Sequence, residues 1–394
     1  MSRKYLPAFL ALGALVFLLA ACTPVEFSPD GKRIVFTWSV DGKSGSLFTM
    51  NVDGTQLQSL PGGTGGLQAR WSPDGKAILF GDVEQNLKAY NAETASAKTI
   101  ALKTTLAFAW KEDSRQFAAV AMATNGTQEL RRYLWPEGTI QSRMPLPPGV
   151  SASSFSQMAW LRGREEVAFL GTDASQHANA YVVSDAGVRK PLESSGAVGI
   201  GQTTDGKNLI WACPGSDPRN SLLKLYQYTA ATGRVARLPY PARLAPINMD
   251  ASRAPTTVES VIFAPHGKWM AIVVDQMPHK GSTVAQAEVS DTVYVARIDG
   301  STAHLVQQVY ATNAEDVPDV KDELIPSWSH DGKRLAVLQW GHSQTSIVLY
   351  NADGSGQKML PLPGHVDDAV VQRIRTYVSR HYPRSLQRPS AGRR

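Results

Sequence analysis

The chain has 394 residues, of which 43% are hydrophobic and 19% charged, with 32 glycines and 24 prolines. The apolar share excludes a wholly disordered chain, and the many Gly and Pro residues are typical of numerous turns between short strands. The net charge of +6 comes from the two ends, where Arg3 and Lys4 and seven arginines among residues 365–394 lie, so the near-neutral body gives no argument for nucleic-acid binding.

The first 21 residues predict a secretory signal peptide. Arg3 and Lys4 precede an almost wholly apolar run from Leu6 to Ala21. The run ends in Leu-Ala-Ala-Cys at Cys22, which resembles the bacterial lipobox and implies cleavage before Cys22 and a lipid on its thiol. A plain transmembrane anchor is the alternative, and it is disfavoured because the run is short for a bilayer crossing.

A lipid on Cys22 would attach the protein to a membrane without spanning it. Thr23, and not Asp, follows the cysteine. By the rule for such lipoproteins, this implies the outer membrane facing the periplasm in a two-membrane bacterium, and the cell surface in a one-membrane bacterium. Cys213 then has no disulfide partner, and we interpret it as a small buried apolar residue.

One sequence pattern recurs after the leader. In residues 71–80 (WSPDGKAILF), an aromatic residue precedes a Ser-Pro-Asp-Gly-Lys turn, and an apolar strand follows. Pro presets its own φ, Asp tolerates a tight bend and Gly supplies a positive φ, so the pattern predicts a β-hairpin. The aromatic residue is expected to be buried between neighbouring sheets. Further copies, some degenerate, stand at residues 27–36, 110–115, 160–164, 204–211, 263–268 and 328–337.

Each copy continues into a third strand with its own turn, as in residues 47–54 (LFTMNVDG), and into a more polar fourth strand. Seven such units occupy residues 25–362. A lone four-stranded sheet cannot bury both faces, whereas radially arranged sheets pack on one another. We therefore predict an all-β fold, a seven-bladed β-propeller of four-stranded antiparallel blades over residues 25–364. A count of six or eight blades stays open.

The aromatic-Ser-Pro-Asp-Gly-Lys turn resembles the hallmark of the TolB-type, WD-repeat-like propeller family, most closely in the first, second and seventh units. The resemblance covers nearly all of the chain after Cys22. It implies a part in protein complexes of the cell envelope.

The two ends of the strands differ in the loops they carry. The Ser-Pro-Asp-Gly turns and the turns between third and fourth strands form one rim, here named the short-turn rim. The other rim, named the loop-rich rim, carries the longest predicted loops, at residues 240–259, 275–291 and 307–325 of the last blades. Long loops on a rigid scaffold commonly bind ligands. The candidate binding residues in these loops are Asp275, His279, Lys280, Glu315, Asp316, Asp319, Asp322 and Glu323.

The acidic run at residues 315–323 has two interpretations. It forms a site for a cation or a basic partner, or, with more weight, a solvated loop. The run contains no Gly, so it does not match a calcium-binding loop.

The sequence shows no catalytic or metal-binding pattern. No two of the eight histidines stand at metal-ligand spacing with a third ligand nearby, and His266 and His330 are interpreted as turn residues of the repeat. Residues 341–345 (GHSQT) lack the final Gly and the following helix of a nucleophile elbow. We expect no catalytic residues, no metal and no cofactor. The alternative is a propeller hydrolase or lyase with its site in the central channel.

The chain ends differently from its body. Residues 366–379 predict one short amphipathic helix, with Asp367 and Asp368 near its start, and a basic disordered tail follows. Contact of this tail with anionic lipid is the alternative to a solvated end. The predicted regions are the signal peptide at 1–21, a lipidated end and linker at 22–24, the propeller at 25–364, and the helix and tail at 365–394.

The functional prediction is a monomeric, non-enzymatic binding scaffold of the cell envelope. It is held on the membrane through the lipid on Cys22, docks an envelope protein or a glycan through the loop-rich rim of the last blades, and binds no nucleic acid.

Overall fold

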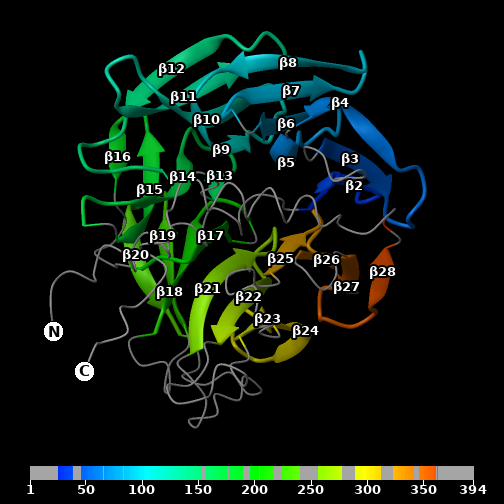
Figure 1. Cartoon of the computed structure of the whole chain (residues 1–394). Coiled ribbons are helices and arrows are strands. Elements are labelled where there is room, and N and C mark those ends of the chain that lie inside the picture. Colours follow the sequence, from blue (N-terminus) through cyan, green and yellow to red (C-terminus); the bar gives the residue numbers. More distant parts are fainter. Residues whose placement is uncertain are drawn as a thin grey trace, which may run out of the picture.

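The computed structural model describes residues 25–38, 46–64, 66–82, 84–152, 157–175, 177–189, 196–203, 205–215, 223–239, 256–276, 289–311, 323–340, 346–360 and 362. Within these ranges, twenty-eight strands form seven four-stranded antiparallel sheets. The sheets stand as blades around a common centre and follow one another in chain order, so that the first and last are neighbours (Figure 1). The predicted seven-bladed propeller is therefore confirmed.

The blades take their strands in chain order. Blade 1 is β1(Glu26–Phe27), β2(Arg33–Trp38), β3(Ser46–Asn51) and β4(Gln58–Thr64); blade 2 is β5(Gly66–Trp71), β6(Ala77–Asp82), β7(Leu87–Asn91) and β8(Ser96–Ala101); blade 3 is β9(Thr104–Trp110), β10(Gln116–Met122), β11(Gln128–Leu134) and β12(Ile140–Pro145); blade 4 is β13(Met158–Trp160), β14(Val167–Thr172), β15(Ala178–Ser184) and β16(Gly187–Arg189). Blade 5 is β17(Gly199–Gln202), β18(Leu209–Pro214), β19(Leu223–Thr229) and β20(Arg234–Leu238); blade 6 is β21(Thr256–Phe263), β22(Trp269–Gln276), β23(Val289–Arg297) and β24(Ala303–Ala311); blade 7 is β25(Glu323–Trp328), β26(Arg334–Trp340), β27(Ser346–Asn351) and β28(Lys358–Leu360).

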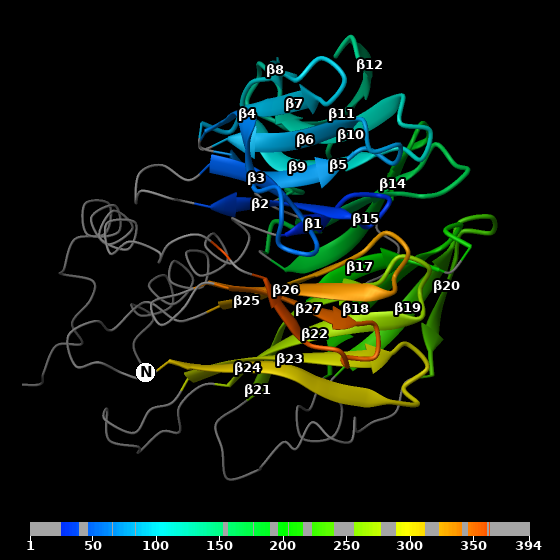
Figure 2. The same cartoon turned by 90° about the vertical axis from the view of Figure 1, so that its right-hand side faces the viewer.

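Within each blade, the first strand lies nearest the centre and the fourth at the periphery (Figure 1). The repeat turn joins the first strand to the second. In the side view of Figure 2 these turns lie at the right-hand end of the strands. The chain therefore runs along each inner strand towards the short-turn rim.

The hydrophobic core lies between the blades. Among the described residues it divides into seven apolar clusters, and each is built from two neighbouring blades. Burying a large side chain in this way stabilises the fold by about 1.5–3 kcal/mol. The aromatic residue before the repeat turn is buried in one such cluster in six blades, which confirms the prediction made for it: Phe27, Trp71, Trp110, Trp160, Phe263 and Trp328.

Side-chain packing joins blade 1 to blade 7. Each of these two sheets is made of four consecutive strands. Phe27 of blade 1 packs in one cluster with Leu338 of blade 7. Arg334 donates to the carbonyl oxygen of Gly31, and its guanidinium carbon lies 5.3 Å from the centre of the Phe27 ring. The ring of blades is thus completed by apolar and cationic contacts.

Blade 6 has longer strands than the sequence analysis predicted. Its second and third strands continue to pair as far as Gln276 and Ser290, and β24 reaches Ala311. The runs WMAIVVDQ and VSDTVYVAR are rich in β-branched residues, which favour the pleated sheet. The loops of blade 6 are correspondingly shorter than expected.

The predicted leader, the lipidated Cys22 and the C-terminal helix at 366–379 lie outside the described residues. In the part of the chain that the structure describes, no helix is long and apolar enough to cross a membrane.

Candidate functional site: a cavity at the centre of the short-turn rim

The repeat turns are held by their own side chains. In blade 2, Ser72 Oγ donates to Asp74 Oδ1 at 2.6 Å, and the same Oδ1 accepts from the backbone N–H of Lys76 at 3.0 Å. Ser72 Oγ, which is buried, accepts from the backbone N–H of Ala77 at 2.9 Å. Blades 1, 5 and 7 repeat the hydroxyl-to-carboxylate bond in the pairs Ser28–Asp30, Thr203–Asp205 and Ser329–Asp331. Four turns of the short-turn rim are therefore held by hydrogen bonds of their own side chains.

A cavity of about 340 Å³ opens at the centre of this rim. Six of the seven blades contribute residues of their turns to its lining, one from each being Pro73, Glu112, Arg162, Thr203, His266 and His330. These turns follow the innermost strands, so the cavity lies at the mouth of the central channel. Its volume is within the range of sites that bind small ligands or single side chains.

The aromatic residues of the lining expose only small parts of their side chains. Trp110, Trp160 and Phe263 are 9%, 6% and 7% exposed. The indole N–H of Trp110 donates to the carbonyl oxygen of Arg70 at 3.1 Å, and that of Trp160 to the carbonyl oxygen of Arg164 at 2.9 Å. These rings therefore support the wall of the cavity from within the core.

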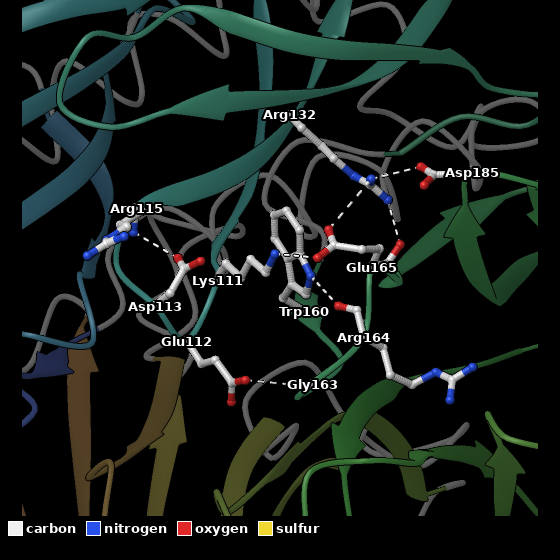
Figure 3. A network of polar contacts seen from close by, with 10 residues as sticks. All are labelled: Lys111, Glu112, Asp113, Arg115, Arg132, Trp160, Gly163, Arg164, Glu165 and Asp185. Atoms are coloured by element: carbon white, nitrogen blue, oxygen red, sulfur yellow. Dashed lines mark hydrogen bonds and ion pairs between the residues drawn. The ribbon is translucent and has the colours of Figure 1, made fainter.

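Trp160 lies among charged side chains from blades 3 and 4 (Figure 3). Lys111 Nζ is 5.3 Å and Arg132 Cζ 5.5 Å from the ring centre, within the range of cation–π attraction. Glu165 pairs with Lys111, and its carbonyl oxygen accepts from Arg132 Nη2 at 2.5 Å. Arg132 Nη1 also pairs with Asp185 Oδ1 at 2.9 Å. Trp160 is thus fixed by two cations that carboxylates hold in place.

A second charged pair stands closer to solvent. Arg162 Nε lies 3.3 Å from Glu112 Oε2, and the side chains are 51% and 48% exposed. Glu112 Oε1 also accepts from the backbone N–H of Gly163 at 3.1 Å (Figure 3). An ion pair this exposed contributes at most about 1 kcal/mol, so an incoming charged group can replace one partner at little cost.

Two histidines of the lining depart from the repeat. His266 stands where the repeat has Asp, and His330 stands where it has Pro. His266 has φ +74° and Gly267 has φ +60°, so the turn of blade 6 has two successive left-handed residues. A left-handed backbone costs a non-Gly residue about 1–2 kcal/mol. Both histidines are turn residues, as interpreted from the sequence. That interpretation did not predict that their side chains line a common cavity.

The inner strands of blades 4, 5 and 6 are tied together on the side of the cavity away from the turns. The side chain of Gln157 accepts from the backbone N–H of Ile200 at 2.9 Å and donates to the carbonyl oxygen of Val261 at 3.2 Å. Val261 N–H in turn donates to the carbonyl oxygen of Val198 at 2.9 Å. A Cβ on Gly199 would stand 2.0 Å from the Val261 oxygen, so only glycine allows this approach.

The predicted binding residues are mostly outside the described part of the chain, namely His279, Lys280, Glu315, Asp316, Asp319 and Asp322. Asp275 lies in β22, where it pairs with Asp291 of β23, and Glu323 begins β25 opposite Trp340. These two are therefore strand residues, not loop residues. Cys213 is a buried thiol near the end of β18, as interpreted from the sequence.

The cavity was not among the sites predicted from the sequence. A signal for it was present in the two turns whose residues differ from the repeat, His266 and His330. Among the described residues, no three His, Cys, Asp or Glu side chains are grouped as metal ligands would be.

No protein-family model matches the chain, and no curated protein sequence matches it significantly. Among solved structures, the β-propeller domain of the Trilobed protease from Pyrococcus furiosus superposes with a TM-score of 0.54 at 14% identity, over 87% of this chain and 99% of that one. An oligogalacturonate lyase from Vibrio parahaemolyticus gives 0.53 at 14% identity, over 81% and 88%. TolB from Acinetobacter baumannii gives a weaker 0.45 at 16% identity, over 87% and 64%. At these identities, the first two likenesses show that this chain shares the propeller fold.

Proposed function

We propose that the protein is a non-enzymatic binding scaffold of the cell envelope, and that it receives a partner protein in the cavity of the short-turn rim. The observation that carries this proposal is the meeting of six blades' turns around one cavity. A partner held there touches most of the ring at once. Since the turns of blades 2, 5 and 7 are held by their own side-chain hydrogen bonds, less conformational entropy is lost on docking.

The charges at the cavity support binding. Lys111, Arg162 and Arg164 are each paired with a carboxylate, respectively that of Glu165, Glu112 and Glu166. The Arg162–Glu112 pair is about half exposed, and an exchangeable ion pair beside a recess is suited to recognising a charged partner and to setting the rate of association.

The place of the N-terminus also supports the proposal. β1 leads into its repeat turn, so the chain enters blade 1 from the side opposite the short-turn rim. Only Thr23 and Pro24 separate Cys22 from the buried Val25. A lipid on Cys22 would then hold the loop-rich rim towards the membrane and leave the cavity facing away from it. A partner in the aqueous space of the envelope reaches a cavity in this orientation.

Site-specific photo-crosslinking in the native envelope tests this function. A photo-reactive amino acid replaces Pro73, which lines the cavity from the turn of blade 2, so that Arg162 stays in place. Matched controls replace Leu102, which is 64% exposed on the loop-rich rim, and Leu305, which is 50% exposed on the outer strand β24. We expect one dominant protein adduct from position 73 alone. An adduct from position 102 instead places docking on the loop-rich rim and overturns the assignment to the cavity.

A hydrolase or lyase with its site in the channel is the second candidate. The cavity lies at the mouth of that channel and holds His266 and Glu112, two side chains able to transfer protons. Turnover of glycan, ester or peptide substrates that is lost in both His266→Ala and Glu112→Gln would establish an enzyme. No turnover by the wild-type protein is the outcome that the binding proposal expects.

A further inference from the structure

We infer that the cavity takes an acidic peptide segment of the partner, bound through its carboxylates by nitrogen donors on the turns of blades 3, 4, 6 and 7. This inference rests on the proposed binding function and names the chemistry of the ligand.

The lining has an excess of nitrogen bases. Its ionisable side chains are one carboxylate, that of Glu112, and five bases, those of Lys111, Arg162, Arg164, His266 and His330. The carboxylates that pair with Lys111 and Arg164 belong to Glu165 and Glu166, which are outside the lining. Lys111 and Arg164 therefore border the cavity while their counter-charges lie beyond its wall, which favours an anionic occupant.

Arg162 is the expected first contact. It is half exposed, and its present partner Glu112 is equally exposed. A ligand carboxylate that replaces Glu112 can bind the guanidinium through two parallel N–H···O bonds, which are shorter and stronger than neutral hydrogen bonds. The displaced Glu112 returns to water and keeps its bond from the N–H of Gly163. The exchange thus leaves no buried charge unpaired.

The aromatic residues favour a peptide over an acidic glycan. A sugar ring binds aromatic residues by lying on an exposed ring face. Trp110, Trp160 and Phe263 are at least nine-tenths buried. The Trp160 ring also makes cation–π contacts with Lys111 and Arg132. What the cavity offers is a small recess whose walls mix apolar and polar side chains, cations among them, and side chains of Asp or Glu on an extended segment fit such a recess.

The test uses the full chain in detergent and nonapeptides selected from a random display library. Each selected peptide is synthesised with its acidic residues intact and with Asp and Glu replaced by Asn and Gln, and both are measured by fluorescence anisotropy. We expect selected peptides to be rich in Asp and Glu. We expect the amide versions to bind at least about tenfold more weakly, as for the loss of one charged contact.

Variants of the protein form the second part of this binding experiment. Arg162→Glu should weaken the binding of the acidic peptide by more than about tenfold. Arg162→Ala should weaken it by less, because the alanine variant removes an attraction without adding a repulsion. The control Arg297→Glu changes an arginine of the same rim that is 40% exposed, pairs with Asp299 and lies outside the lining. It should leave the affinity within about twofold.

Three results overturn the inference. The first is selected peptides without acidic residues, and the second is binding that Arg162→Glu does not change. The third is an oligogalacturonate probe that binds in an Arg162-dependent manner where peptides do not, which makes the occupant a glycan. If the crosslink from position 73 still captures a protein in such a case, only the ligand class fails. If that crosslink is also absent, the proposed function fails as well.

Discussion

Arg70 of blade 2 forms an ion pair with Glu26 of blade 1, with 2.9 Å between Nη1 and Oε2. The other oxygen of Glu26 lies 3.7 Å from His330 Nε2 of blade 7. One carboxylate on a two-residue strand thus contacts both neighbouring blades. Burial raises the pKa of Glu26, but the charge of Arg70, the nearby His330 and the hydrogen bond from Arg70 outweigh it, so this pKa lies below the usual 4.5.

We predict that Glu26→Gln destabilises the propeller by about 1–3 kcal/mol at neutral pH, because it leaves the partly buried Arg70 without its counter-charge. The folded-state pKa is depressed, so the stabilisation by Glu26 is fully present above the unfolded value of 4.5 and is lost as the pH falls below it. Denaturant titrations at pH 7, 5 and 3.5 measure the difference between wild type and variant.

The control for this prediction is Glu93→Gln. Its partner is Lys76, both side chains are about 60% exposed, and the expected effect is below about 0.5 kcal/mol. If the difference in free energy of unfolding between wild type and Glu26→Gln grows as the pH falls, the role given to this carboxylate is contradicted.

The approach of blades 5 and 6 gives a second prediction. Gly199→Ala places a Cβ 2.0 Å from the carbonyl oxygen of Val261 and should cost about 3 kcal/mol, as overpacking against backbone does. Gly233→Ala is the control: its φ is +68° but nothing stands within 4 Å, so only the backbone penalty of about 1 kcal/mol applies. Chemical denaturation measures both. Equal costs for the two variants would show that the inner strands can separate freely.

The repeat turn gives a third prediction. The hydrogen bond from Ser28 is the largest cause that lowers the pKa of Asp30, followed by the bond from the backbone of Lys32. Ser28→Ala should therefore raise this pKa towards its usual 3.8, as followed by carbon NMR of the carboxyl group. Lys32→Gln keeps the backbone bond and removes only a weak, more distant charge, so it should change the pKa little. An Asp30 pKa that is unchanged in Ser28→Ala contradicts this account of the turn.

The repeat made the fold predictable. Residues such as Trp71 and Ser72 recur with the same neighbours in several units, and each copy needs a sheet on either side to bury its aromatic residue. Radial stacking meets that need at every unit, so the strand order and the interblade core follow from local sequence. The reach of β22 and β23 to Gln276 and Ser290 was missed, because the Gln-Met-Pro-His and Ala-Glu-Val-Ser segments gave no clear strand end.

The cavity was less predictable because it depends on which blades stand side by side. Gly199 and Gly201 alternate on one strand, which is a sign of close backbone approach, but the sequence does not name Val261 and Phe263 as the neighbours. His266 likewise reads as a tolerated turn residue in isolation. Only the ring brings it to the same recess as Arg162 of blade 4.

The charged surroundings of Trp160 give a fourth prediction. A double-mutant cycle of Lys111→Met and Trp160→Leu should show a coupling of about 0.5–1 kcal/mol in unfolding free energy, since Lys111 Nζ lies 5.3 Å from the ring centre. Arg115→Met with Trp160→Leu is the control cycle. The backbone N–H of Arg115 donates to Asp113 on the same turn (Figure 3), and the cations described over the Trp160 ring are those of Lys111 and Arg132, so the coupling of the Arg115 side chain to Trp160 should be near zero. Similar couplings in the two cycles would argue against the cation–π contact.

The left-handed backbone of His266 gives the last prediction. A non-Gly residue at φ +74° carries strain that Gly does not, and part of the gain from Gly is offset by its greater freedom in the unfolded chain. His266→Gly should therefore stabilise the propeller by up to about 1 kcal/mol. It should also weaken the binding of the acidic peptide, because one donor of the lining is lost. Denaturation and peptide anisotropy measure the two effects on the same preparation.

Ala95→Gly is the matched control for His266→Gly. Ala95 is exposed on the turn of blade 2 after β7, has φ +49° and lies outside the cavity lining. It should give a comparable stabilisation and leave peptide affinity unchanged. If His266→Gly is neutral or destabilising and binds peptide as well as wild type does, the imidazole belongs to the turn alone and the cavity has one donor fewer.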